Sequence, residues 1–158
     1  MFHYKKIDFN NGETYRYKLL QKVVFVTGRE LGKWELYTPD NTIVAKCFGS
    51  VVAVFPNYMW DGTTVIGDYY EDEVTLKASL IHDVLYNAKK NPNDVKLPFT
   101  LWEADSILAD YLSIGYRKKK SFFKKLLTPF IYKWGLWTLG IPWKFGNNKY
   151  YILKKNQE

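Results

Sequence analysis

Residues 74–88 read VTLKASLIHDVLYNA and carry the clearest helical pattern in the chain. Apolar residues recur three or four positions apart, which places them along one face of an α-helix. His82 lies at the edge of that face, one helical turn from Ala78 and from Leu85. The segment therefore predicts an amphipathic helix with an imidazole at the border of its apolar face. The apolar stripe consists of Val74, Ala78, Ile81, Leu85 and Ala88.

A second helix is expected to begin at a capping box formed by Thr100 and Glu103 and to end at Gly115. A carboxylate occupies one of its inward positions, where an unpaired charge is costly and a partner is nearly obligatory. The nearest donor on the facing helix is His82, so we expect His82 and Asp105 to meet inside the protein. The inward stripe of this helix consists of Leu101, Asp105, Leu108 and Leu112.

The first 55 residues predict a small antiparallel β-sheet, because short runs of β-branched and aromatic residues alternate with polar ones. Residues 34–37 are expected to pair with residues 42–45 as a hairpin. The turn between them, residues 38–41, has proline where a type I turn favours it. Cys47 falls in a predicted strand, and we interpret it as a small buried residue rather than a nucleophile.

The chain has 158 residues, of which 47% are hydrophobic and 25% charged, as is usual for one globular domain. Its single cysteine allows no internal disulfide. The net charge of +7 is uneven: residues 116–158 hold 11 Lys and Arg and one acid, whereas the earlier residues hold 12 basic and 15 acidic residues. We therefore predict one α+β domain with a β platform (1–55), a loop and two core helices (56–115), and a basic aromatic helical segment (116–158).

The loop over residues 56–71 is long enough to suggest a functional role. Asp61–Gly62 is a turn signal, and the acids that follow offer oxygen ligands for a hard cation such as calcium. The alternative is structural: acids before a helix offset its dipole, and Asp72 is a plausible N-cap. The polar residues in question are Thr63, Thr64, Asp68, Glu71, Asp72 and Glu73.

Residues 126–143 are almost all apolar, but two prolines, two glycines and an internal lysine argue against a membrane span. One interpretation is a helix that lies on an anionic bilayer. The alternative is a hydrophobic tail that packs over the two helices, and nucleic acid is a less favoured partner because no known motif is present. Residues 150–153 either add a strand or trail free. The candidate membrane or partner-binding residues are Lys118, Lys119, Lys120, Lys124, Lys125, Trp134 and Trp137.

These segments together resemble the bacteriophage protein family known as domain of unknown function thirteen fifty-three. The matching segments are Trp60–Thr64, Ser79–Tyr86, Ala104–Asp105 and the aromatic tail that ends near Gly146. The resemblance covers roughly the whole chain. It implies a phage or prophage origin and a place in the host cytoplasm or the virion, and it carries no established activity.

The helix with His82 is also similar to the core of phospholipases of the A-two type. That resemblance implies that His82 acts as general base, that Asp105 orients it, and that Tyr86 supports the network by hydrogen bonding. It also implies that Asp83 is a calcium ligand, next to a calcium loop reduced here to Asp61–Gly62. The flanking cysteines of those enzymes are absent from this sequence.

Three functional hypotheses follow. The first is a calcium-assisted lipid ester hydrolase at a membrane surface, peripheral to the inner face of the membrane and docked by the basic tail. The second is a non-enzymatic phage structural or host-interaction protein whose His82, Asp83 and Asp105 form a buried network. The third is a peripheral membrane binder without chemistry. An open pocket at His82 favours the first, and a ring covered by Tyr86 and Trp60 favours the second.

Overall fold

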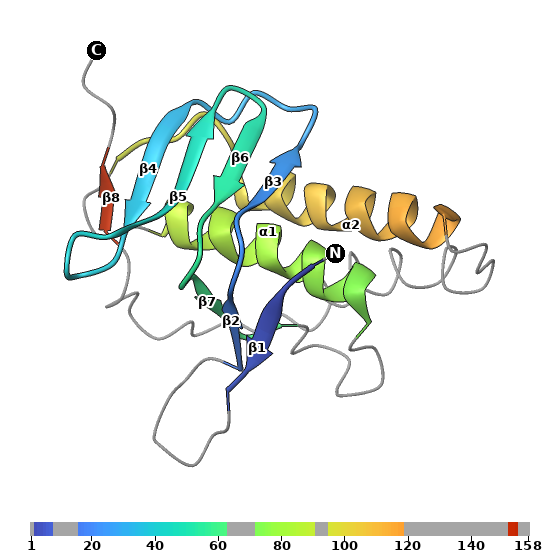
Figure 1. The fold of residues 1–158 in the computed structure, drawn as a ribbon. Coiled ribbons are helices and arrows are strands. Elements are labelled where there is room, and N and C mark those ends of the chain that lie inside the picture. Colours follow the sequence, from blue (N-terminus) through green and yellow to red (C-terminus); the bar gives the residue numbers. More distant parts are fainter. Residues whose placement is uncertain (1, 8–15, 63–71, 91–94, 119–151, 155–158) are drawn as a thin grey trace.

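A computed structural model describes residues 2–7, 16–62, 72–90, 95–118 and 152–154, in which β-strands precede two helices (Figure 1). The α+β class expected from the sequence is confirmed. The basic aromatic segment lies outside the described residues, apart from its first three positions and 152–154. The elements are β1 (Tyr4–Lys6), β2 (Tyr17–Leu19), β3 (Val23–Val26), β4 (Lys33–Tyr37), β5 (Ile43–Phe48), β6 (Val51–Val54), β7 (Met59–Trp60), α1 (Glu73–Lys89), α2 (Leu101–Lys118) and β8 (Ile152–Lys154).

The described strands form two antiparallel sheets, where the sequence predicted one. The larger has the order β3-β6-β5-β4-β8 and the smaller the order β1-β2-β7. β2 runs on into β3 and β6 runs on toward β7, so the two sheets are one long ribbon interrupted in the middle. At the interruption Asn57 adopts a positive φ of 73° and donates its backbone N–H to Leu19 O. That left-handed residue breaks the regular alternation, which is why the ribbon divides.

The expected hairpin is confirmed, since β4 pairs with β5 across the predicted turn. Asn41 takes the left-handed conformation there, with a φ of 65°. A bulge lies between Leu36 and Tyr37. The question about the end of the chain is also answered, because β8 pairs with β4 and adds an edge strand.

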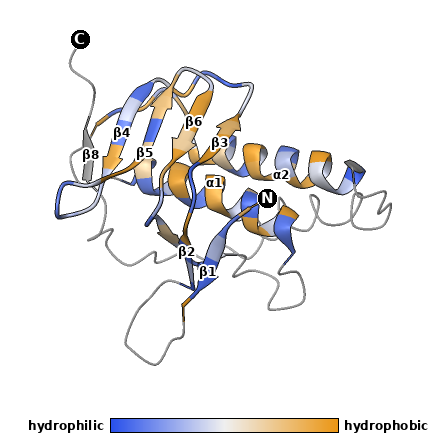
Figure 2. Cartoon of the chain, in the orientation of Figure 1, coloured by the Kyte–Doolittle hydropathy of each residue, from blue (hydrophilic) through white to orange (hydrophobic). Residues whose placement is uncertain are grey.

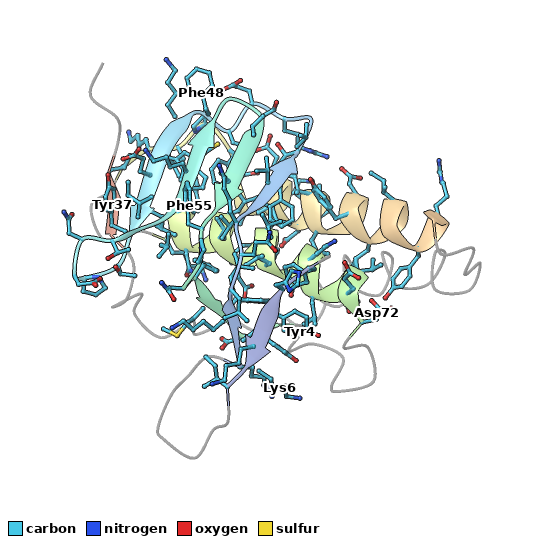
Figure 3. All side chains as sticks on the ribbon, viewed as in Figure 1. Tyr4, Lys6, Tyr37, Phe48, Phe55 and Asp72 are labelled. Carbon is cyan, nitrogen blue, oxygen red and sulfur yellow. The ribbon has the colours of Figure 1, made fainter. Side chains whose placement is uncertain are left out.

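α1 begins where the sequence indicated. Asp72 is its N-cap, and its carboxylate accepts hydrogen bonds from the backbone N–H groups of Val74 and Thr75, each at 3.0 Å (Figure 3). The Thr75 hydroxyl completes the capping box by accepting from the Asp72 backbone N–H. The sequence offered Asp72 as a cation ligand or as a helix N-cap, and the structure shows it as the N-cap.

α2 also begins as predicted, since Glu103 and Thr100 exchange hydrogen bonds. Its predicted end was wrong: the helix continues past Gly115 to Lys118. Gly115 is required for close packing instead, because a Cβ at this position would lie 2.4 Å from Cγ1 of Val74 on α1. The glycine thus marks the closest approach of two helices rather than a C-cap.

The two helices pack side by side against one face of the sheets, and their apolar sides face the strands (Figures 1 and 2).

Cys47 is buried as predicted, and burial, aided by the charge of Glu30, raises the pKa of its thiol to about 12. Part of the expected loop over 56–71 is strand β7. Among the described residues, no helix has both the length and the apolar character needed to cross a bilayer. The largest fully buried side chains include Trp34, Trp60, Tyr17, Tyr58 and Tyr116.

Candidate functional site: a buried histidine between carboxylates

α1 and α2 bring together the two residues whose contact the sequence predicted. Nε2 of His82 lies 2.9 Å from Oδ1 of Asp105, and the same oxygen accepts a hydrogen bond from the Tyr86 hydroxyl at 2.7 Å. Tyr86 is one turn after His82 on α1, so both donors reach one carboxylate on α2. The inward-facing carboxylate of Asp105 therefore has the His82 partner that the sequence predicted, together with the Tyr86 hydroxyl.

The second nitrogen of the imidazole also faces a carboxylate. Nδ1 of His82 lies 3.4 Å from Oδ1 of Asp83, and Oδ2 of Asp83 accepts the backbone N–H of Asp61 at 3.3 Å. A connected polar network therefore runs from the end of β7 through α1 to α2. We call the set of His82, Asp83, Tyr86 and Asp105 the His82 centre.

The His82 centre lies inside the protein. His82 is 7% exposed and Asp83 8% exposed, and the Tyr86 ring packs on the imidazole with 4.2 Å between ring centroids. Tyr86 thus covers the ring, which is one of the two contacts that the second hypothesis expected. Trp60 is also fully buried, and its indole N–H donates to the Ser79 hydroxyl at 3.2 Å and so fastens β7 to α1.

The charges of the centre follow from these contacts. Burial acts to lower the pKa of His82, but the hydrogen bonds and negative charges of Asp105 and Asp83 outweigh it, so that the pKa is raised. The raised pKa favours the imidazolium form of His82, in which both ring nitrogens donate. Burial raises the pKa of Asp83, while the hydrogen bond with His82 acts in the opposite direction. Burial and the adjacent Asp105 raise the pKa of Tyr86 well above its usual range, so its hydroxyl stays protonated.

Asp61 stands at the end of the network with an unsatisfied oxygen. Its Oδ1 is buried and makes no hydrogen bond with any described residue. Burial, reinforced by the negative charge of Asp83, raises the pKa of Asp61 to about 6, although Arg16 acts in the opposite direction. Gly62 follows with a φ of 76°, and a Cβ there would lie 2.5 Å from the Tyr17 ring. The turn predicted at Asp61–Gly62 therefore needs glycine for both conformation and space.

The residues expected to bind calcium are only partly assembled. Asp61 and Asp83 lie close together, and Gly62 is next to Asp61 in the chain, but calcium takes six to eight oxygen ligands. Within the described part of the chain, no group of three or more His, Cys, Asp and Glu residues could hold a metal ion. Thr63, Thr64, Asp68 and Glu71 lie outside that part. The role of these residues as calcium ligands stays a prediction.

Sequence reasoning missed several side chains that fix the site. Ser79, within the apolar face of α1, accepts from Trp60, and the Asn87 amide donates to the Tyr58 hydroxyl at 2.6 Å. The positive charge of Arg16 acts to lower the pKa of Asp61. The signal for Ser79 was present, since a buried polar side chain implies a partner. The other two depend on pairing between distant segments and have no local signal.

The candidate membrane-binding residues lie mostly outside the described residues. Lys118 is the last residue of α2, whereas Lys119, Lys120, Lys124, Lys125, Trp134 and Trp137 fall beyond the described part of the chain. Their role in membrane or partner binding stays a prediction.

Comparison of the chain with protein-family models, with curated protein sequences and with solved structures found no match. The two family resemblances noted in the sequence therefore stay predictions.

Proposed function

We propose that this chain is a non-enzymatic phage structural or host-interaction protein in which the His82 centre is a structural lock. By a lock we mean a buried polar network that fixes the position of α2 and of the Asp61 turn on α1. The observation that carries this proposal is that both imidazole nitrogens of His82 face carboxylates, at 2.9 and 3.4 Å. An imidazolium held in this way has no free lone pair with which to accept a proton.

Burial and charge both support the lock. A general base must reach the proton that it abstracts, directly or through one water, and its pKa should lie near the working pH. His82 is buried beneath Tyr86, and its neighbours raise its pKa. These features favour an imidazolium ring held by its two carboxylate partners over one that is free to exchange a proton with a substrate.

Unfolding measurements on His82→Gln and Asp105→Asn test the lock. Asp105→Asn leaves the imidazole with Asp83 as its only carboxylate partner, and His82→Gln leaves the partly buried Asp105 with the Tyr86 hydroxyl as its donor. Each variant is expected to lower the free energy of unfolding by about 2 kcal/mol or more. The effects should be strongly non-additive in the double variant, because the two residues share one contact. Ser106→Ala is the matched control on α2, since this hydroxyl donates to the Trp102 carbonyl of its own helix.

The opposite result contradicts the lock and is the behaviour expected of a catalytic centre. Residues kept for catalysis are often unfavourable for the fold, so that replacing them raises stability while activity is lost. If His82→Gln unfolds at the same or a higher denaturant concentration than the wild type, the lock is wrong. This outcome is clear even without knowledge of a substrate.

A second candidate function is a calcium-assisted lipid ester hydrolase, and the buried Oδ1 of Asp61, unpaired among the described residues and close to Asp83, favours it. In this candidate Asp61, Asp83 and Gly62 would hold the ion, which would offset negative charge that develops on the substrate. His82 would accept a proton from water, and Asp105 and Tyr86 would orient the ring. This role requires that His82 lose its contact with Asp83.

Calcium titration distinguishes the two candidates. A calcium-dependent rise in the unfolding temperature that Asp61→Asn abolishes, together with ester cleavage that His82→Ala abolishes, supports the hydrolase. A wild-type protein with no change in unfolding temperature and no cleavage of phospholipid vesicles in calcium removes it. Magnesium at the same concentration is the control for ionic strength.

A further inference from the structure

The outer face of the two sheets, opposite the helices, carries lysines without an acidic partner among the described residues. Lys5 on β1 lies directly opposite Lys18 on β2, and Lys22 is exposed in the segment between β2 and β3. Within the described part of the chain, none of these three lysines forms an ion pair. Like charges directly opposite each other on antiparallel strands are destabilising unless an anion lies between or above them. Within the described residues, the positive charges of Lys5 and Lys18 are therefore not offset by an acidic side chain.

Exposed aliphatic side chains alternate with the lysines along the same strand line. From residue 18 to residue 26, Leu19 and Phe25 are buried, whereas Leu20, Val24 and Val26 are 52%, 54% and 67% exposed. Within β2 and β3 the alternation follows from the two-residue period of an extended strand, which points every second side chain away from the core. Between the two strands, residues 20–22 are all exposed, so Lys and aliphatic side chains succeed one another at the surface of residues 18–26.

The neighbouring strands extend this apolar surface. Val51 on β6 lies opposite Val26, and Phe48 on β5 lies opposite Val51, so the three side chains form one row across the larger sheet. Phe48 is 68% exposed and lies at the far end of that sheet (Figure 3). Figure 2 shows β3 and β6 as hydrophobic strands above the more hydrophilic β1. An outward aliphatic row on a sheet is unusual for a face that remains in water.

We propose that this face docks on an anionic membrane surface. Its lysines would meet lipid phosphates, and its Val, Leu and Phe side chains would rest in the boundary between head groups and acyl chains. Charge complementarity supports this occupant, because strands β1, β2, β3, β5 and β6 contain no Asp or Glu, and Glu35 of the neighbouring strand β4 is paired with Lys46.

The composition of the face favours lipid over protein or nucleic acid as the partner. The centres of protein–protein interfaces are depleted in lysine and enriched in arginine and aromatic residues, unlike this face. Single-stranded nucleic acid is bound by exposed aromatic rings on which bases stack, and the outward positions named here hold one aromatic side chain, Phe48. The proposal involves neither the His82 centre nor the basic tail, so it stands or fails independently of both.

Vesicle binding by the full chain tests the proposal. The probes are vesicles of phosphatidylcholine alone and of phosphatidylcholine mixed with phosphatidylglycerol, assayed by co-sedimentation at increasing salt. We expect binding to the mixed vesicles only, and weaker binding as salt rises. Each lysine near an anionic bilayer contributes roughly a fivefold gain in affinity. The triple variant Lys5→Ser, Lys18→Ser and Lys22→Ser should therefore bind roughly a hundredfold more weakly.

Two further variants make the test specific. Val26→Thr with Phe48→Thr keeps the charges and the strand propensity, and it should also weaken binding because the apolar contact is lost. Ile114→Ser with Arg117→Ser, on the exposed side of α2, is the matched control and should bind like the wild type. Circular dichroism and thermal unfolding establish that every variant folds.

Three results overturn the proposal. The first is a wild-type protein that does not sediment with the mixed vesicles. The second is binding that the triple lysine variant retains but that neutralisation of Lys118, Lys119 and Lys120 removes, which assigns the membrane contact to the tail. The third is equal binding to a DNA duplex and to vesicles with no effect of Val26→Thr and Phe48→Thr, which indicates a general polyanion site.

Discussion

Replacement of Asp61 by Asn is expected to stabilise the protein above neutral pH. Asp61 has a buried Oδ1 without a hydrogen bond to any described residue, and its pKa is raised from 3.8 to about 6. A shift of about two pH units corresponds to about 3 kcal/mol for ionising this group in the folded protein. Because the rest of the side chain is partly exposed and Arg16 lies near, we reduce the expected gain to about 1–2 kcal/mol.

The pH dependence gives this prediction its sign. The unfolded chain releases the Asp61 proton near pH 3.8, and the folded protein releases it near pH 6. Between these values the folded state binds more protons, so rising pH favours unfolding, and the full cost is present above pH 6. The amide that replaces the carboxylate in the Asp61→Asn variant carries no charge at any pH. The advantage of this variant should therefore be greatest near pH 8 and small near pH 4.

Urea unfolding followed by tryptophan fluorescence measures this difference at both pH values. Titrating groups that do not interact with Asp61 contribute equally to the two proteins and cancel in the comparison, whereas the repulsion between Asp61 and Asp83 is part of the measured difference. Asp110→Asn is the matched control, since Asp110 is an exposed carboxylate that pairs with Arg29 across 3.5 Å and should matter little. If Asp61→Asn is less stable than the wild type, or if the difference does not change with pH, then ionised Asp61 has a favourable partner and our interpretation of this carboxylate is wrong.

Three further predictions concern α1 and α2. Tyr86→Phe removes the 2.7 Å hydrogen bond to Asp105 and should lower the free energy of unfolding by about 1–2 kcal/mol in a urea titration; an unchanged value would show that this hydroxyl contributes nothing. Gly115→Ala should destabilise by about 2 kcal/mol despite the higher helix propensity of alanine, because its Cβ meets Val74 at 2.4 Å; a higher melting temperature would contradict the close approach of the helices. Because the pKa of His82 is raised above 6.5, its stabilising contribution is complete below pH 6.5 and declines as pH rises through the higher folded-state value. An NMR titration of the His82 ring that gives a pKa below 6.5 would refute the prediction that folding raises this pKa.

The sequence predicted the helical core because its signals are local. The three- and four-residue spacing of apolar side chains, the cap at Asp72 and the Thr100–Glu103 capping box each involve neighbouring residues. The contact between His82 and Asp105 could also be predicted, although 23 positions separate the two residues. Its signal was energetic rather than local: an inward carboxylate demands a partner, and few donors were available on the facing stripe.

Features that depend on tertiary packing were not accessible in this way. Gly115 was interpreted as a helix end because glycine usually has that role, whereas here it provides space for Val74. The division of the ribbon into two sheets depends on the left-handed conformation of Asn57, which the sequence did not indicate. The cover over His82 was only half predicted, since Tyr86 lies on the ring while Trp60 bonds to Ser79.

The His82 centre also accounts for the way in which the two helices align. Four contacts connect them in antiparallel order: Val74 with Gly115, His82 and Tyr86 with Asp105, and the Lys89 ammonium with the Leu97 carbonyl just before α2. A slip of α2 by one turn would leave the partly buried Asp105 carboxylate without its donors and would place a side chain where Gly115 makes room for Val74. Apolar stripes alone tolerate such slips, because one leucine can replace another at little cost. We infer that the polar contact specifies one alignment that hydrophobic packing leaves undetermined, a role that buried polar residues serve in coiled coils.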